Sequence, residues 1–496
     1  MTTRLLLFVI AFVAGCSGNT PSPAPPPETP TSAPVPVEQP ADAPASAAFS
    51  GHALPADTEY YRDGPRQSRP PDGTLKAGTK VMVIEDAGSY CRIRSEDGIV
   101  AFIAADAIRP PGDPGPQAAP DLAVVNDGNN PFAFDLYNRL AKEHPGNIFF
   151  SPYSISTALA MTYAGARGQT EKEMAQVLHF GLPQPDLHRS FGGLVARLHG
   201  DNKKGGYQLQ IANRLWGQTG YVFDPAFLQV TRDSYRAGFA QVDFVQQRET
   251  ARQTINNWVE QQTNKKIRNL IGPDALNDLT RLVLTNAIYF KGTWTSPFEQ
   301  ELTKDAPFKV TTNQEVMVPL MCQTGFFSCG DAENVQILDM PYGDGTLSML
   351  ILLPKRIDGL ADLEKGLTVE TLNRLSSTMN PQMLMVYVPR FSMTSEFGLG
   401  DTLASMGMPS AFGPGADFTG MNPSGELFVS FVIHKAFVDV NELGTEAAAA
   451  TAVGEMGAAF PEAPPTFRAD HPFLFLIRHN PTKSILFLGR VVNLKA

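Results

Sequence analysis

The chain has 496 residues, 43% of them hydrophobic, and a formal net charge of −10 with a pI near 5.4. A disordered protein would be poorer in apolar residues, and single cores rarely grow beyond about 300 residues, so we expect more than one folded unit. The acidic balance argues against a dedicated nucleic-acid surface, and no nucleic-acid partner is expected.

Residues 1–15 have the pattern of a targeting segment. Arg4 supplies a positive charge, residues 5–14 are apolar, and small residues lead up to Cys16. Ten residues at about 1.5 Å each are too short for a bilayer core of about 30 Å. The segment resembles a bacterial lipoprotein signal peptide, which implies that Cys16 becomes the acylated first residue of the mature chain. An ordinary secretory signal with an incidental cysteine is the alternative.

This resemblance gives an expectation for location. The protein would be secreted across the inner membrane and held to the membrane by a lipid anchor. The residue after the cysteine is Ser17 and not an acidic residue. By the same resemblance, this favours the outer membrane or the cell surface.

Residues 16–56 are rich in Pro, Ala, Ser and Thr. They lack apolar periodicity and cannot form a core, so a disordered tether is predicted. A Pro-rich chain extends by up to about 3.1 Å per residue, so this tether could hold the rest of the protein up to roughly 120 Å from a membrane.

Residues 57–110 alternate short strand-like runs with turn residues. The clearest runs cover residues 80–84, 90–94 and 98–103. The region resembles a small bacterial Src-homology-3-like, all-β barrel, which implies a peptide or cell-wall ligand. Tyr60, Tyr61 and Tyr90 could line a binding groove, although a structural role in a small core is the favoured interpretation. A linker rich in Pro and Gly follows at residues 111–120.

The sequence carries no common catalytic motif. A Gly-x-Ser-x-Gly elbow, a His-Glu-x-x-His zinc motif and a phosphate-binding Gly-Lys-Ser loop are all missing, and the 8 histidines are scattered. We therefore expect no enzyme activity, no catalytic residue, no cofactor and no metal. With Cys16 assigned to lipid, Cys91, Cys322 and Cys329 remain. Cys322 and Cys329 either pair in an oxidising envelope or stay as buried free thiols.

An unusual run of small residues lies near the C-terminus. Residues 428–440 are rich in β-branched and aromatic side chains and predict a strand, and residues 441–451 then read NELGTEAAAAT. Four alanines alone favour a helix, but glycines and prolines follow closely and would end it. Further strand-like runs cover residues 467–477 and 484–492.

Five motifs in chain order resemble the serpin family. They are NIFFSPYSISTALAM at 147–161, LTNAIYFKGTW at 284–294, ADFTGM at 416–421, GTEAAAAT at 444–451 and FRADHPFLFLI at 467–477. The resemblance implies a serpin domain over residues 121–496. Its fold would be α+β, with a large central mixed β-sheet, helices and an exposed reactive loop, and the helix interpretation of the alanines is dropped.

The resemblance implies a covalent, suicide-type inhibitor of serine proteases. The protease would attack a bait bond in the loop, form an acyl complex, and be carried along as the cleaved loop inserts into the sheet. The hinge of this movement would consist of small residues that fit between packed strands. They are Gly444, Thr445, Glu446, Ala447, Ala448, Ala449, Ala450 and Thr451.

The family's spacing also locates the bait bond. Counting forward from Gly444 and backward from Phe473 reaches Ala458 both ways, which places the bond at Ala458–Ala459. A small residue before the cut suits elastase-like or subtilisin-like proteases. Met456 keeps a shifted register open.

Strand parity adds one difficulty. On insertion, Thr445 and every second residue after it would face the core, and this set continues to Glu455. An unpaired buried carboxylate is costly, so Glu455 must lie near the end of the sheet, find a cation, or slow the last step of insertion.

The resemblance implies two further sites. A hydrogen-bonded cluster that gates strand separation would contain Ser151, Ser154, Asn286 and His434. Trp294 would lie beneath the point where the loop enters the sheet. Two alternatives stay open, a non-inhibitory serpin and a cell-wall-binding module in which the serpin part is a passenger.

Overall fold

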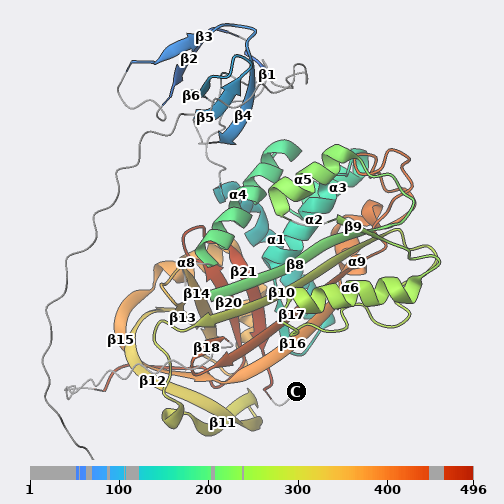
Figure 1. Ribbon diagram of the computed structural model, residues 1–496. Helices are drawn as coiled ribbons and strands as arrows, with labels where there is room; N and C mark the ends of the chain where they lie inside the picture. The colour runs from blue at the N-terminus through green and yellow to red at the C-terminus, as the bar shows by residue number, and fades with distance from the viewer. Residues whose placement is uncertain are drawn as a thin grey trace, which may run out of the picture. The chain divides into compact units, whose positions relative to one another are not determined.

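The structure, a computed structural model, describes residues 52–54, 56–62, 70–86, 90–104, 107, 122–202, 207–236, 239–445 and 463–494 (Figure 1). They fall into two units, one within residues 1–115 and one within residues 116–496. Cys16, hinge residues 446–451 and the predicted bait bond at Ala458–Ala459 lie outside the described residues. In the part of the chain described here, we find no helix both long and apolar enough to cross a membrane.

The first unit is an antiparallel sheet of six short strands. They are β1 (His52–Ala53), β2 (Thr58–Tyr61), β3 (Gly73–Leu75), β4 (Lys80–Asp86), β5 (Tyr90–Ser95) and β6 (Val100–Ala104). Their order is β1-β4-β5-β6-β2-β3. The three predicted runs correspond to β4, β5 and β6, whereas β1, β2 and β3 are too short to give a clear pattern. Tyr60 and Tyr61 are buried, so their role is structural.

The second unit combines helices with two sheets. The helices are α1 (Leu122–Glu143), α2 (Pro152–Tyr163), α3 (Gly168–Val177), α4 (Gln184–Asn202), α5 (Pro225–Tyr235), α6 (Arg248–Gln262), α7 (Leu360–Lys365), α8 (Val369–Ser377) and α9 (Gly400–Met406), with 3-10 turns at Gln300–Leu302 and Pro409–Phe412. Two of the helices begin with a proline after a capping side chain, Ser151 before α2 and Asp224 before α5.

The larger sheet has nine strands. They are β7 (Ile148–Phe150), β11 (Lys304–Thr311), β12 (Gln314–Ala332), β13 (Val335–Tyr342), β14 (Leu347–Pro354), β15 (Asn380–Pro389), β19 (Thr466–Arg468), β20 (Phe473–His479) and β21 (Ile485–Val491). Their order is β19-β15-β12-β13-β14-β20-β21-β7, with β11 paired to β12. Residues 467–477 thus form two strands, and between them stands Pro472, which has no amide hydrogen to donate.

The smaller sheet is mixed and contains the functional region. Its strands are β8 (Tyr207–Gln218), β9 (Phe239–Val242), β10 (Leu282–Thr293), β16 (Phe391–Gly398), β17 (Phe431–Asn441) and β18 (Gly444–Thr445). Their order is β16-β17-β18-β10-β8-β9. The predicted strand at 428–440 corresponds to β17, displaced by up to three residues.

The side chains of alternate residues of β10 pack into different hydrophobic clusters on the two faces of the sheet. Leu284 and Ile288 belong to the main core, which also contains residues of α2. Val283 and Ala287 belong to smaller clusters with Ile255 and Val259 of α6, and α6 runs across this face of the sheet in Figure 1. The central strands are therefore covered on both faces, as their nearly continuous apolar sequence requires.

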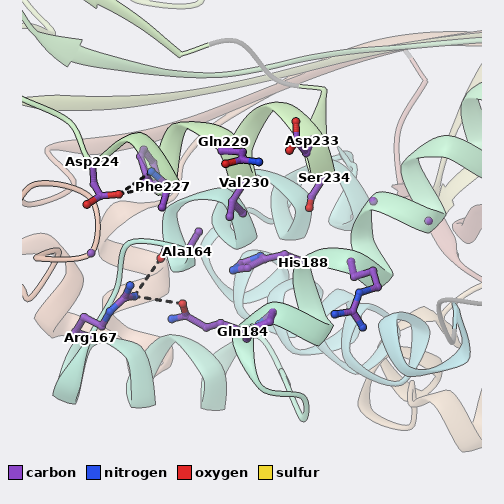
Figure 2. A pocket seen from close by; sticks show the side chains of 16 residues that line it. Ala164, Arg167, Gln184, His188, Asp224, Phe227, Gln229, Val230, Asp233 and Ser234 are labelled. Atoms are coloured by element: carbon purple, nitrogen blue, oxygen red, sulfur yellow. Dashed lines mark hydrogen bonds between the residues drawn. The ribbon is translucent and has the colours of Figure 1, made fainter. Parts of the chain in front are cut away.

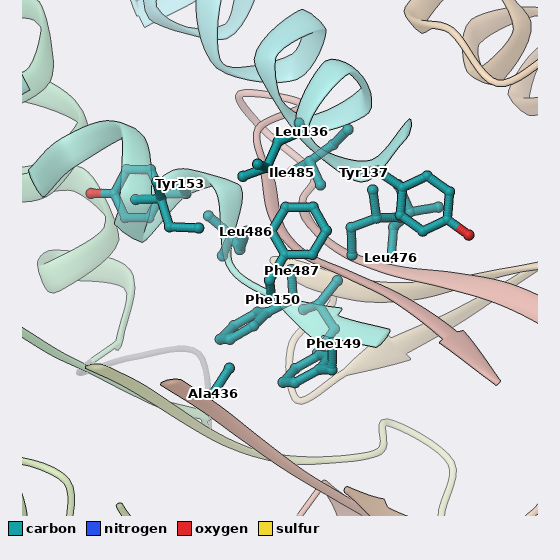
Figure 3. Close-up of a cluster of buried hydrophobic side chains, with 14 of the residues drawn as sticks. Leu136, Tyr137, Phe149, Phe150, Tyr153, Ala436, Leu476, Ile485, Leu486 and Phe487 are labelled. Carbon is teal, nitrogen blue, oxygen red and sulfur yellow. The ribbon is translucent and has the colours of Figure 1, made fainter. Parts of the chain in front are cut away.

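Aromatic rings fill the main core where α1 and α2 meet β7 and β21 (Figure 3). Phe149 lies nearly parallel to Phe487, with ring centroids 5.2 Å apart, and stacks on Phe475 at 5.7 Å. All residues of β20 and β21 are buried. This burial explains the apolar composition of the C-terminal motif.

The two C-terminal cysteines do not pair. Cys322 and Cys329 both lie on β12, seven residues apart, and an extended strand of that length spans about 23 Å. The Cα atoms of a disulfide lie only about 4–7 Å apart. The pairing alternative is therefore wrong, and among the described residues Cys322 and Cys329 form no disulfide.

Candidate functional site

β10 and β17 are neighbours in the sheet, but their contact changes along their length. Over Val283–Tyr289 and Phe431–Phe437 they pair directly and in parallel; we call this stretch the closed segment. Further along, β18 lies between them and is antiparallel to both, with Thr445 opposite Gly292 on one side and Val440 on the other. We call this second stretch the split segment.

The chain reaches the split segment through a tight reversal after β17. Gly444 has a φ of +147°, which other residues rarely adopt. A Cβ atom at this position would collide with the carbonyl oxygen of Gly292. Glycine is therefore required here by the close approach of two backbones, a reason that the sequence alone did not reveal.

Thr445 points into the protein and has a buried partner. It is fully buried, and its hydroxyl lies 2.7 Å from the phenol oxygen of Tyr342 at the end of β13. Burial raises the pKa of Tyr342 far above its usual value, so the phenol keeps its proton. Sequence reasoning missed Tyr342, because a tyrosine at the end of a strand carries no signal of such a role.

Trp294 holds the reversal from beneath. Its backbone N–H donates to the carbonyl of Leu443 at 2.9 Å, and its indole N–H donates to the carbonyl of Asn441 at 3.0 Å. Its ring stacks on Tyr342 with centroids 4.3 Å apart. The structure thus brings Trp294, Gly444 and Thr445 together, as their predicted roles require.

Glu442 connects the same reversal to two other segments of the chain. Its side chain is buried, and its carboxylate accepts a hydrogen bond of 2.9 Å from the Thr303 hydroxyl. Arg390 lies 3.4 Å away and forms an ion pair with it. The sequence analysis did not identify this contact, which joins residues that are far apart in the chain.

The predicted cluster lies beneath the closed segment. Asn286 and His434 are opposite each other in the β10–β17 pairing, and the His434 Nδ1 contacts the Asn286 side-chain oxygen. The Asn286 amide donates to the Ser154 hydroxyl at 2.6 Å. Ser151 completes the cluster, since its backbone N–H donates to His434 Nε2 at 3.1 Å. All four predicted residues are therefore joined in one fully buried network.

A fifth member of the network escaped the sequence analysis. Asn213 of β8 accepts from the Asn286 amide at 2.6 Å and from the Ser154 hydroxyl at 3.2 Å. Its own amide donates to the Ser154 carbonyl at 3.1 Å. β8 contains several other polar residues, so a polar side chain at this position did not stand out in the sequence and did not identify its partners.

The network fixes the protonation state of His434. Because Nε2 accepts from the Ser151 amide, the ring proton must be on Nδ1, where it is donated to Asn286. Burial lowers the pKa of His434 to about 3. A second proton would have to bind at Nε2, where it would point at the Ser151 N–H. The cluster is therefore suited to holding the strands together and not to proton transfer.

Comparisons with known proteins agree with this geometry. A family model described as serpin (serine protease inhibitor) matches residues 127–494. The chain belongs to the serpin family. Leukocyte elastase inhibitor of Sus scrofa is 46% identical to this serpin over 381 residues, which cover 75% of this chain and 99% of that protein. The Xenopus tropicalis protein of the same name is 44% identical over 367 residues, covering 72% and 96%.

Solved structures show the same fold. Uncleaved ovalbumin superposes with a TM-score of 0.67 at 33% identity, covering 74% of this chain and 99% of that one. The structure of human thyroxine-binding globulin complexed with thyroxine gives a TM-score of 0.69 at 34% identity, covering 75% of this chain and 99% of that one. The expected α+β serpin fold is therefore confirmed.

Proposed function

We propose that this serpin is a suicide-type inhibitor whose cleaved loop inserts between β10 and β17. The observation that carries the proposal is the split segment, where the first two loop residues already lie between these strands. Insertion along the closed segment would replace one parallel pairing with two antiparallel ones. Antiparallel pairs are slightly more stable per residue, and each added hydrogen bond contributes about 1 kcal/mol net.

The register of β18 predicts how far insertion can proceed. Each further loop residue would lie opposite the preceding residue of β10, so Glu455 would reach Leu282, the first residue of that strand. The small hinge residues would then fill the strand interior, and the carboxylate would arrive at its end. Leu282 is fully buried, so a carboxylate beside it must turn toward water to remain solvated. We therefore expect the insertion of Glu455 to be the slowest step.

The target is proposed to be an elastase-like or subtilisin-like serine protease. Support comes from the small residues at the bait bond, Ala458–Ala459, and from relatives named leukocyte elastase inhibitor. Incubation with pancreatic elastase, subtilisin and trypsin, followed by a denaturing gel, tests the assignment. A covalent complex is expected with elastase or subtilisin and not with trypsin.

A matched variant makes this experiment sharper. Ala458→Arg should transfer complex formation to trypsin, whereas Met456→Arg should do so only if the bond lies two residues earlier. A protein that is cleaved by every protease without forming a complex would contradict the inhibitory function. It would favour the non-inhibitory alternative. A structure of similar fold supports this alternative, since it is described as a thyroxine-binding globulin in complex with thyroxine.

We also propose that the N-terminal part attaches the inhibitor to an envelope. The sequence around Cys16 and the Pro-rich tether support a lipid anchor, and stable anchoring needs more than one acyl chain. Cys16→Ser should move the protein from the detergent phase to the soluble fraction while leaving inhibition unchanged. Equal partitioning of the wild-type and Cys16→Ser proteins would contradict the lipid anchor and favour an ordinary secretory signal.

The six-stranded first unit is proposed to be a Src-homology-3-like barrel that binds a cell-wall peptide. Sedimentation of the protein with purified peptidoglycan tests this, compared with a form lacking residues 52–107. Equal sedimentation of both forms would contradict it.

A further inference from the structure

A large cavity lies between parts of α4 and α5. Its volume is about 880 Å³, within the range of about 300–1,000 Å³ that is usual for small-molecule sites. Residues of α4, α5, the turn after α2 and Gly420 line it, and none of the strands described for either sheet contributes. It is therefore a site separate from the split segment.

The shape of the cavity follows from how the two helices meet. At Gly192 they are in contact, since a Cβ atom there would lie 3.2 Å from the backbone of Ser234. The cavity opens toward the N-terminal ends of both helices, where Gln184 and Asp224 line it. Figure 2 shows Val230 and Phe227 along one wall and His188 facing them from α4. Ala164 and Phe227 are buried apolar residues, so much of the interior suits an apolar body.

His188 presents a polar atom to this space. The residue is only 5% exposed, and its Nδ1 lies 2.6 Å from the Tyr235 hydroxyl. Its Nε2 is buried and has no hydrogen-bond partner among the described residues. Buried polar atoms are rarely left in that state, so an unpartnered nitrogen beside a cavity indicates a ligand.

The hydrogen-bond partner of His188 Nδ1 determines whether Nε2 carries a hydrogen. Among the described residues, the Tyr235 hydroxyl has no acceptor other than His188, and burial raises the phenol pKa well above its usual value. The phenol therefore keeps its proton and donates it to Nδ1. Burial and the nearby charge of Arg167 lower the pKa of His188 to about 4, so the neutral ring carries its single hydrogen on Nε2. The cavity thus contains a hydrogen-bond donor.

The charged residues of the cavity differ in how far their side chains are already engaged by other residues of the protein. The Asp224 carboxylate accepts from the amides of Ala226 and Phe227 at the start of α5, and Arg189 forms an ion pair with Asp186 at 3.0 Å. Asp233 is exposed at the rim. Arg167 donates from Nη1 to the Ala164 and Ala166 carbonyls and to the Gln184 side chain, and its positive charge acts on His188.

We propose that this cavity binds a small amphipathic monocarboxylate. The carboxylate would accept from His188 Nε2–H and lie near Arg167, and an aromatic or branched apolar body would pack against Ala164, Phe227 and Val230. This site is independent of protease inhibition and does not rest on the function proposed above.

The test uses 1-naphthylacetate as the probe and protein with ¹⁵N-labelled histidine. Titration should shift the His188 Nε2 resonance in a saturable way, and 1-naphthylmethanol, which lacks the carboxylate, should bind at least about tenfold more weakly. His188→Phe removes the donor and should cause a loss of similar size. No saturable shift at millimolar probe would overturn the site, and equal binding of the alcohol would overturn the carboxylate assignment.

Two exposed positions on α5 provide a matched pair of controls. Gln229 lines the cavity, whereas Arg232 does not. Gln229→Trp should block binding, and Arg232→Trp should leave it unchanged, with the same melting temperature in both variants. Undiminished binding in Gln229→Trp would place the probe elsewhere and overturn the proposal, even if His188→Phe fails to fold.

Discussion

The closed and split segments involve the same two strands, which are held in opposite ways. In the closed segment β10 and β17 bond to each other, and the Asn286–His434 contact spans the pair from below. In the split segment the strands bond to β18, and the Thr445 hydroxyl lies 2.7 Å from the Tyr342 hydroxyl. Strand separation is thus stable where a small loop residue fills the gap, and a buried network opposes it where the gap is closed.

Thr445→Arg is expected to have the largest effect on this difference. The site is fully buried, and burying an unpaired guanidinium costs several kcal/mol, so the loop should be expelled from the split segment. Proteases should cleave the variant and release it without a covalent complex. Thr445→Val, which keeps the size of the side chain, is the control and should still form complexes; normal inhibition by the arginine variant would contradict the role of Thr445.

Asn286→Ala should weaken the closed segment without touching the loop. It removes the acceptor of the His434 ring proton and the donor to Ser154 and Asn213, a loss of about 3 kcal/mol for buried groups left unpaired. The variant should lose inhibitory activity faster on storage, because the loop inserts without cleavage.

A matched control separates this effect from general instability. Asn256 of α6 is also buried and forms two hydrogen bonds with Ile271, at 2.8 and 2.9 Å, but it lies outside the network. Asn256→Ala should lower the melting temperature without faster loss of activity. If both variants lose activity at the same rate, the network does not control opening.

The closed segment should also weaken in acid. The pKa of His434 is about 3 in the folded protein and about 6.5 when unfolded, so below pH 6.5 the unfolded chain binds more protons. Stability is fully present above about pH 6.5 and falls toward pH 3, with a loss of about 2 kcal/mol by pH 5 from this group. His188 acts in the same direction, since its pKa is about 4.

Urea unfolding at pH 7 and pH 5 measures this loss. The difference in midpoint between the two pH values should shrink in His434→Phe and persist in His199→Gln, which changes an exposed histidine. An unchanged difference in His434→Phe would show that His434 is already protonated or solvated in the folded protein.

Tyr342→Phe should have the smallest effect. It removes one hydrogen bond, about 1 kcal/mol, and keeps the stacking on Trp294. Hydrogen exchange at the Thr445 amide should become about fivefold faster, while complex formation continues. Thr445→Val removes the same bond from the other side, so the double variant should be no faster than either single one. Additive effects would mean that the two hydroxyls do not interact.

Of the strands in the closed and split segments, local patterns predicted only β17. The serpin resemblance identified four network residues and Trp294. Asn213, Tyr342 and Glu442 could not be found in this way, because each acts through a partner far away in the chain. The need for Gly444 became clear only from the neighbouring Gly292 backbone. The α4–α5 cavity was equally inaccessible, since it depends on how three separate segments pack around His188.

The central claim is that the loop becomes a strand between β10 and β17, and melting before and after cleavage tests it most directly. Limited digestion with elastase should raise the melting temperature by well over about 10 °C, because the inserted strand forms two antiparallel ladders of hydrogen bonds in place of one parallel ladder. Thr445→Arg, cleaved in the same way, should show a much smaller rise. An unchanged or lower melting temperature in the cleaved wild-type protein would contradict insertion.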